Sequence, residues 1–395
     1  MLGVAVQNHT LDIKVNGRSS VDGVSYAVNV VAGDTAAIIA GKINDAINNA
    51  QSVCPVTSVV NTTSLTLSSR WNGESANDIN ITITPSYAST PVTYTISTSA
   101  TGLGVPTVTG SLSKIGNQWA TIILNTYQFN VTNSVANELM AWNGVPDPNT
   151  PTGRYSGSIW KPAIAVTGSV TDNDSIITDL LLNDVTIALA PAPLSKGMPC
   201  EAAANMVRLL ARQAQDSPHL DVSGSTYPDM PTPTDIGTMA TYANRDFYVK
   251  KGNSTVDLVD GKYKIMDFVT TYHPTGEAVP QFRYVRSLIQ DFNINFSYAL
   301  LEAQNVENKA IAGDDDIVTV QGVIKPKIWK GILFGLADDL SERAIIADSE
   351  FMQESIVVNL SSSNPNRLET FFRYKRSGYT NILSTTGEAG FNFGE

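Results

Sequence analysis

The residue pair Asp260-Gly261 constrains the fold more than any other feature, because it separates two runs rich in strand-forming residues, Val256–Val259 and Lys262–Tyr272. A two-residue hairpin loop of type I′ needs a positive φ at both central residues, and Asp-Gly between apolar runs is a strong short-range signal for it. The sequence therefore predicts a β-hairpin, near the start of a C-terminal module that extends from Arg245 to Glu395.

Two helices and two more strands are predicted after this hairpin. In the first helix, apolar residues recur at three- and four-residue steps and form one stripe: Val285, Leu288, Phe292, Phe296, Ala299 and Ala303. The second helix begins at Pro326, a residue suited to the first turn, and buries Trp329, Leu333 and Leu336. The strand candidates are Ser355–Leu360 and Arg367–Arg373. Together with the hairpin strands they are expected to supply one sheet of an α+β domain.

Acidic residues Asp314 to Asp316 lie between the two helices. Three consecutive carboxylates do not point the same way, so a solvated loop is favoured over a cation site. A strand, Ile317–Val320, is expected to follow this loop.

Short alternating runs near the N-terminus indicate half-buried strands: Leu11–Val15, Tyr26–Val30, Leu65–Ser68 and Ile79–Thr84. One helix lies among them, with Asp34 or Thr35 as its cap. Its buried stripe is expected to contain Ile39, Ile43, Ala46 and Ile47. Residues 1–98 thus read as a small β-rich unit with one helix.

Strand and helix patterns alternate through residues 99–244, which favours a mainly parallel sheet. The strand candidates are Trp119–Leu124, Trp160–Thr167 and Val185–Ala190. The helix candidates are Asn133–Trp142, Ser175–Asn183 and Glu201–Ala214.

Three stretches, taken in order, resemble the C-terminal region of contractile tail sheath proteins, especially those of Mu-like phages: "FYVKKGNSTVDLVDGKYKIMDFVTTYHPTG", "RYVRSLIQDFNINFSYALLEAQ" and "NRLETFFRYKRSGYTNILSTTGEAGFNF". The segment "GDTAAIIAGKINDAINNA…TLTLSSRWNGESANDINITI" is similar to the domain inserted in those sheaths. Family members usually carry a further domain and an N-terminal arm before the inserted domain. That arm is therefore expected to be absent, truncated or encoded elsewhere.

The resemblance implies a mixed α/β and α+β multidomain fold. Its parts are a β-rich peripheral domain (1–98), an α/β middle domain (99–244), a C-terminal sheath domain facing the tube (245–378) and a strand-exchanging C-terminal arm (379–395). It implies a structural subunit, not an enzyme, that polymerises helically around an inner tail tube and contracts to drive that tube through the host envelope. The implied partners are other copies of the chain, the tube protein, and baseplate and tail terminator proteins. The implied location is the virion, after assembly in the host cytoplasm, with no cofactor.

Composition agrees with a folded protein that neither binds nucleic acid directly nor inserts into a membrane. The 395 residues carry a net charge of −11, whereas binding to a nucleic-acid backbone needs clustered Lys and Arg. No apolar run is long enough to cross a bilayer. The two cysteines, Cys54 and Cys200, are expected to be reduced thiols rather than a disulfide or a metal site.

Two other functions remain open at this level. An α/β hydrolase, active or degenerate, would need a nucleophile, and none of His9, His219 and His273 lies in a recognisable catalytic motif. A monomeric surface adhesin would account for the Thr/Ser-rich N-terminal unit but not for an apolar C-terminus.

Two candidate interaction sites follow. The C-terminal arm carries Ile382, Leu383, Phe391 and Phe393 after the polar segment 375–378, which is predicted to act as a hinge. An apolar terminus must be docked, and pairing with the sheet of a neighbour would cover it. A local group of cations is the candidate tube contact, with an ordinary solvated helix face as the alternative: Lys325, Lys327, Lys330 and Arg343.

Overall fold

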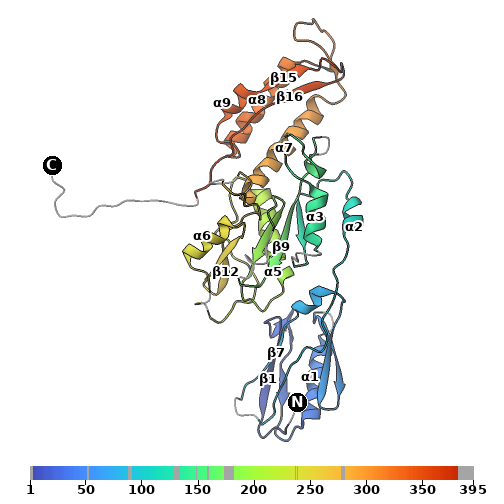
Figure 1. Cartoon of the computed structure of the whole chain (residues 1–395), viewed down its shortest axis with the longest axis vertical. Coiled ribbons are helices and arrows are strands. Elements are labelled where there is room, and N and C mark those ends of the chain that lie inside the picture. Colours follow the sequence, from blue (N-terminus) through green and yellow to red (C-terminus); the bar gives the residue numbers. More distant parts are fainter. Residues whose placement is uncertain are drawn as a thin grey trace, which may run out of the picture. The chain divides into compact units, whose positions relative to one another are not determined.

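The computed structural model describes residues 3–50, 53–87, 91–128, 134–147, 149–157, 160–172, 182–235, 237, 239–276 and 281–380. The chain divides into two compact units, each taken by itself below. Unit 1 comprises Met1–Arg212 and Val222–Val285, and unit 2 comprises Gln213–Asp221 and Arg286–Glu395. Both contain helices and strands, as the fold class predicted (Figure 1). None of the described helices is long and apolar enough to span a membrane.

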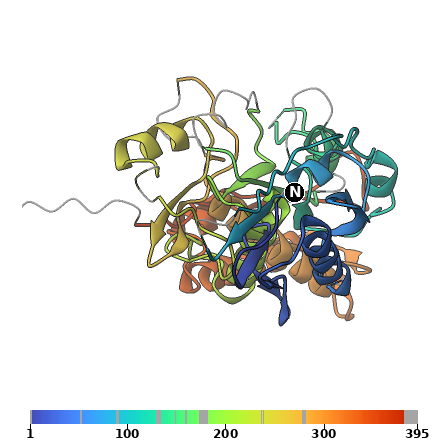
Figure 2. The same cartoon turned by 90° about the horizontal axis from the view of Figure 1, so that it is seen from below.

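The first part of unit 1 is a sheet covered by one helix. Strand β1 (His9–Val15) lies between β4 (Val28–Val30) and β7 (Ile81–Pro85), and both pairings are antiparallel. Helix α1 (Ala36–Asn49) begins after Thr35, whose side chain accepts the backbone N–H of Ile38. The helix lies beside these strands (Figures 1 and 2) and contributes Ile39, Ile43 and Ile47 to a core that also holds Leu11 and Ile13.

These elements confirm the predicted helix and three of the predicted strands. Strand β6 (Ser64–Ser69) confirms the fourth, Leu65–Ser68. Its partner β5 (Val56–Asn61) was not predicted, because its exposed end breaks the alternation of apolar and polar residues. The remaining short elements are β2 (Ser20–Val21), β3 (Val24–Ser25) and the 3₁₀ turn η1 (Glu74–Asp78).

A parallel sheet forms the next part of unit 1, as predicted. Its order is β10 (Ile187–Pro191), β9 (Ile164–Ser169) and β8 (Ile122–Asn125). The helices of this part are α2 (Thr109–Ser113), α3 (Val135–Asn143) and α5 (Pro199–Asp216), with a 3₁₀ turn η2 (Gly153–Tyr155). The predicted helix Ser175–Asn183 lies almost wholly outside the described residues.

Close packing of α5 on this sheet depends on Gly168 in β9. A Cβ at this position would lie 1.7 Å from the carbonyl oxygen of Pro199. Any larger residue would therefore push the first turn of α5 away from the sheet.

The predicted hairpin is present in the last part of unit 1. Strands β11 (Thr255–Val259) and β12 (Lys262–Asp267) pair through Asp260 and Gly261, whose φ values are 51° and 69°, as a type I′ turn requires. The chain after β12 leaves the hairpin, and the backbone N–H of Thr271 donates to Ile187 in β10. Helix α6 (Tyr242–Lys250) precedes the hairpin.

Unit 2 contains helix α7 (Val285–Asn305) from Arg286 onward, helix α8 (Pro326–Glu342), the short helix α9 (Ser349–Ser355), and a hairpin of β15 (Val357–Leu360) and β16 (Leu368–Phe371). Two short strands, β13 (Ala310–Ile311) and β14 (Val323–Ile324), pair in parallel between the long helices. The core gathers around Trp329, whose indole N–H donates to the Thr370 hydroxyl (3.2 Å).

Three expectations for this region are wrong. The strand Ile317–Val320 is an exposed loop, in which Ile317 is 96% exposed. The four long strands form two separate hairpins, β11–β12 in unit 1 and β15–β16 in unit 2, instead of one sheet. The α7 stripe is buried only as far as Phe292, because Ile294, Tyr298 and Leu301 on the opposite face pack on the unit 2 core.

Candidate assembly site

The C-terminal segment Tyr374–Tyr379, called the C-terminal anchor below, is held by polar side chains of α7. Arg376 binds both carboxylate oxygens of Asp291, through Nε to Oδ1 (2.7 Å) and Nη2 to Oδ2 (2.6 Å). The Tyr374 hydroxyl donates to the same Oδ1 (3.0 Å). Burial raises the pKa of Tyr374 far above its ordinary value, and the Asp291 charge adds to the rise. The phenol therefore stays protonated and remains a donor.

Ser377 is the second fixed point of the anchor. Its hydroxyl accepts from Gln290 Nε2 (2.8 Å) and Arg286 Nη2 (2.9 Å) and donates to the carbonyl of Ala344. Its backbone N–H donates to Ile345 (3.1 Å).

Arg286 also donates to the Ser377 carbonyl (2.9 Å) and lies against the ring of Tyr379, 5.7 Å from its centroid. The prediction that residues 375–378 form a hinge is therefore wrong. Their polar side chains are ligands of α7 and of the loop after α8, and they fix the chain in place up to Tyr379.

The arm residues that the sequence singled out, Ile382, Leu383, Phe391 and Phe393, lie outside the described residues.

The β15–β16 hairpin offers a surface on which a further strand could pair. Val358 faces the core, whereas Val357 and Phe371, directly opposite each other, are 46% and 54% exposed. No third strand pairs with this hairpin in the described part of the chain. An unpaired strand edge beside exposed apolar side chains is the kind of site to which an extended segment binds by adding a strand.

The four candidate tube-contact cations have different surroundings. Lys325 is the N-cap residue of α8, and its ammonium donates to the carbonyls of Asp314 and Asp316. Arg343 pairs with Asp339 one turn earlier (3.2 Å). Lys327 is exposed, and Lys330 Nζ lies 5.6 Å from the centroid of the Phe334 ring. Of these four side chains, only the ammonium groups of Lys327 and Lys330 are without a carboxylate or carbonyl contact among the described residues.

The acidic loop before α8 has a structural use. Asp314 Oδ1 accepts the backbone N–H of Lys327 (2.8 Å), and Asp316 Oδ2 accepts that of Gly313. A carboxylate at this position satisfies a free N–H group of the first helical turn and opposes the helix dipole.

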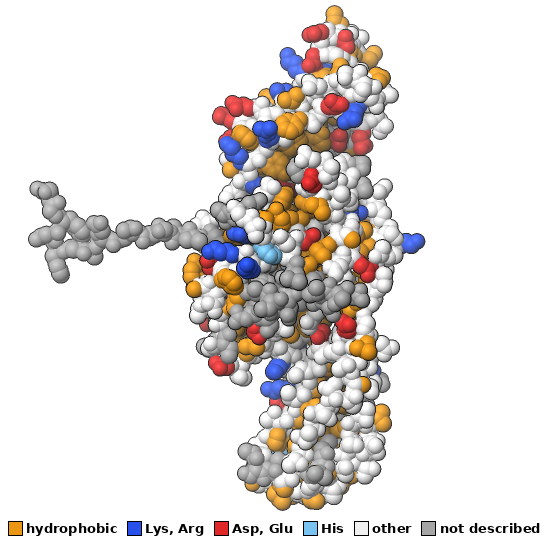
Figure 3. All heavy atoms as spheres, in the orientation of Figure 1, with side chains coloured by type: hydrophobic (Ala, Val, Ile, Leu, Met, Phe, Trp, Pro, Cys, Tyr) orange, Lys and Arg blue, Asp and Glu red, His pale blue; other side chains and the backbone are white. Residues whose placement is uncertain are grey.

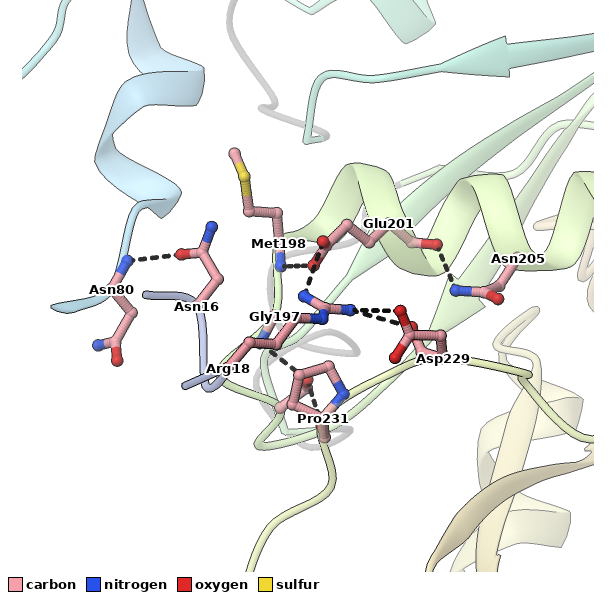
Figure 4. Close-up of polar contacts among 10 residues, drawn as sticks. Asn16, Arg18, Asn80, Gly197, Met198, Glu201, Asn205, Asp229 and Pro231 are labelled. Atoms are coloured by element: carbon pink, nitrogen blue, oxygen red, sulfur yellow. Dashed lines mark hydrogen bonds and ion pairs between the residues drawn. The ribbon is translucent and has the colours of Figure 1, made fainter. Parts of the chain in front are cut away.

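An arginine-centred contact joins the N-terminal sheet to α5 within unit 1 (Figure 4). Arg18 follows a tight turn at Asn16 and Gly17, where φ is 49° and 77°. Its Nη1 donates to Glu201 Oε1 (2.8 Å), and its Nη2 donates to the carbonyl of Asp229 (3.0 Å). Glu201 Oε2 accepts the backbone N–H of Met198 (2.7 Å), so one carboxylate caps α5 and binds Arg18.

The turn before Arg18 fits closely against its neighbours. A Cβ on Gly17 would lie 2.9 Å from Pro231 Cβ and 3.0 Å from Lys196 Cβ. Asn16 Oδ1 accepts the backbone N–H of Asn80 (2.8 Å) and thereby holds the turn to its own sheet. Sequence inspection missed this contact, although Asn16-Gly17 is itself a hairpin-turn signal.

Two of the three histidines, His9 and His273, contact backbone groups through their rings. Nδ1 of His9 lies 3.0 Å from the carbonyl oxygen of Gln7, and Nδ1 of His273 lies 2.6 Å from that of Thr271. Within the described ranges, no group of three His, Cys, Asp or Glu residues is placed to hold a metal ion.

A comparison with known sequences bears on the candidate functions. The chain is 23% identical over 379 residues to the Mu-like prophage FluMu tail sheath protein of Haemophilus influenzae, and the match covers 93% of this chain and 73% of that protein. The chain resembles a phage tail sheath protein over nearly its whole length. The predicted resemblance to Mu-like sheaths is confirmed. No protein-family model matches the sequence.

Solved structures add two remote likenesses. A sheath tail protein from Desulfitobacterium hafniense gives a TM-score of 0.44 at 12% identity, covering 95% of this chain and 82% of that chain. A chain of the anti-feeding prophage baseplate gives 0.38 at 10% identity, covering 58% and 61%. Both TM-scores are too low to carry an argument of their own.

Proposed function

We propose that this chain is a structural subunit of a contractile tail sheath, without catalytic activity. In this role many copies polymerise helically around an inner tail tube and contract to drive the tube through the host envelope. The observation that carries the proposal is the similarity to a Mu-like prophage sheath protein along 93% of the chain. Assembly in the host cytoplasm, location in the virion, and contacts with baseplate and tail terminator proteins belong to the same proposal.

The copies are linked, in this proposal, by the C-terminal arm. Residues 381–395 of one copy pair as a strand with the β15–β16 hairpin of a neighbour. Two observations support this: the hairpin exposes Val357 and Phe371 beside an edge with which no described strand pairs, and the C-terminal anchor holds the chain up to Tyr379. Burial of Phe391 and Phe393 contributes about 1.5–3 kcal/mol each, before the entropy lost in ordering the arm is subtracted.

The domain boundaries at residues 98, 244 and 378 and the outward position of residues 1–98 in the sheath stay proposals. Contact between the inner tube and α8 is a further one. It is supported by Lys327 and Lys330, whose ammonium groups contact no carboxylate or carbonyl among the described residues.

Electron microscopy of the purified full-length chain tests the function, because a sheath subunit forms long tubes. Truncation after Thr380 tests the arm, since it keeps the whole C-terminal anchor. The truncated chain should retain its circular dichroism spectrum and remain monomeric. Glu388→Gln in the full-length arm is the matched control and should assemble normally. Tubes formed by the truncated chain would remove the arm from the proposal, and a wild-type chain that never assembles would refute the sheath function.

A further inference from the structure

Helix α7 carries apolar side chains on two opposite faces. Beyond Phe292, one face packs on the unit 2 core through Ile294, Tyr298 and Leu301. The other face, called the α7 outer face, consists of exposed residues three and four positions apart: Phe296, Ala299, Leu300 and Ala303. Phe296 is 61% exposed and Leu300 is 48% exposed. A helix that is apolar on both sides is typically covered on both sides.

Uncompensated negative charge borders this face. Glu302 and Glu307 lie at its C-terminal end, and neither carboxylate has an ion-pair partner in the described part of the chain. Burial raises the pKa of Glu302, and the nearby Glu307 charge adds to the rise. A partner that covers the α7 outer face is therefore expected to bring cations.

Helix α8 of the same unit has a complementary exposed face, called the α8 outer face. It presents Ile328 (49% exposed) and Phe334 (36% exposed) together with Lys327 and Lys330. Between the two apolar side chains, a Cβ added at Gly331 or Gly335 would meet nothing within 4 Å. There is thus room for an apolar side chain from another molecule. Hydrophobic side chains on the visible surface of unit 2 are drawn in orange in Figure 3.

The pairing of α7 with α8 inside one copy gives a guide to how α7 of one copy could lie along α8 of another. The rings of Tyr298 and Trp329 lie 5.8 Å apart, and Gln290 Nε2 donates to the carbonyl of Ile345 (3.0 Å). Residue numbers rise along one helix as they fall along the other, so the two helices are antiparallel. If a second copy were stacked in the register of Tyr298 and Trp329, Phe296 would lie opposite Gly331. Glu302 would lie near the N-terminal end of α8.

We propose that the α7 outer face of one copy packs on the α8 outer face of a second copy, with Glu302 and Glu307 facing Lys327 and Lys330. This inference rests on the proposed self-assembly. The two surfaces differ, so the contact is heterologous and leaves one free surface at each end, as an open helical polymer requires. This contact uses Lys327 and Lys330, and it is therefore the alternative to the tube contact proposed above.

Sedimentation velocity of full-length variants tests the contact. Phe296→Asp should weaken self-association at least about tenfold, because the contact would then bury an Asp carboxylate among apolar side chains. Ile317→Asp is the matched control, because it removes an even more exposed apolar side chain outside both faces. Both variants should keep the wild-type circular dichroism spectrum, since neither side chain belongs to the core.

A charge exchange tests the orientation. Glu302→Lys with Glu307→Lys, and Lys327→Glu with Lys330→Glu, should each block assembly, and an equimolar mixture of the two double variants should restore it. If the wild-type chain assembles but Phe296→Asp assembles equally well, or the mixture does not recover, this contact alone is refuted. If the Lys327→Glu, Lys330→Glu variant assembles normally but no longer binds the tube, these lysines belong to the tube contact. That result also refutes the contact between the α7 and α8 outer faces. A wild-type chain that stays monomeric overturns the proposed function together with this inference.

Discussion

Arg376 and Asp291 lie 85 positions apart in the sequence and meet through two charge-assisted hydrogen bonds of 2.7 and 2.6 Å. Their side chains are only 24% and 9% exposed. The pair joins the last described segment of the chain to the long helix of unit 2.

Arg376→Met should destabilise unit 2 by roughly 3–5 kcal/mol, because the substitution leaves the Asp291 carboxylate buried without its counter-ion. Urea unfolding followed by circular dichroism measures the change. Arg343→Met is the control: its partner Asp339 is 56% exposed, and loss of such a surface pair costs about 0.5 kcal/mol or less. Equal losses in the two variants would show that the buried pair does not stabilise the unit.

Arg18→Met should weaken the contact between the N-terminal sheet and α5. The side chains of Arg18 and Glu201 are 16% and 31% exposed, and hydrogen bonds to charged groups contribute about 1.5–3 kcal/mol. Hydrogen exchange of the first turn of α5 should accelerate, because Glu201 also caps that turn. Lys14→Met, which removes only an exposed 3.8 Å pair with Asp12, should leave the exchange unchanged.

The stability of unit 1 should depend on the protonation of Asp78. Burial raises the pKa of Asp78 from 3.8 to about 6, against a smaller opposing effect of the Gln128 amide that donates to it. Because the folded-state pKa is above the unfolded value, the folded state holds its proton more tightly. Stability therefore falls as the pH rises from about 4 to about 6.

Asp78→Asn keeps the acceptor for Gln128 and removes this dependence. The variant should match the wild type near pH 4 and exceed its stability at pH 7.5 by about 1 kcal/mol, allowing for solvent screening. Thermal unfolding at the two pH values measures this. A variant that is less stable than the wild type at pH 7.5 would mean that the charged carboxylate is needed.

Two glycines with similar backbone angles should respond differently to alanine. Gly252 (φ 78°) has the carbonyl oxygen of Thr271 only 2.5 Å from where a Cβ would lie, whereas Gly261 (φ 69°) has nothing within 4 Å. Gly261→Ala should cost about 1–2 kcal/mol, from the left-handed conformation alone. Gly252→Ala should cost more, because the backbone must also move. Equal unfolding free energies for the two variants would contradict this.

Local signals predicted the elements of this chain well, and contacts between distant segments were predicted poorly. Asp260-Gly261 specifies its hairpin because the turn needs only those two residues. By contrast, the strands of β11–β12 and β15–β16 look alike in sequence, and nothing local shows that they belong to different units. The stripe on α7 was predicted from spacing, but spacing cannot tell which of its residues the core buries.

The contacts of the C-terminal anchor were likewise not predictable from local sequence. Residues 375–378 have the composition of a hinge, and their partners Arg286, Gln290 and Asp291 lie more than 80 positions earlier in the chain. Polarity alone does not distinguish a solvated linker from a segment bound by a distant helix. The structure supplies that difference through individual hydrogen bonds.

The C-terminal anchor also has a mechanical consequence. A tensile force applied to the chain beyond Thr380 reaches α7 through Arg286, Gln290 and Asp291, which lie within two turns of one helix. Hydrogen bonds from both Ser377 and Arg376 to this helix oppose such a force. The polypeptide at this point can thus transmit a pull to the body of unit 2 before the anchor separates from the helix.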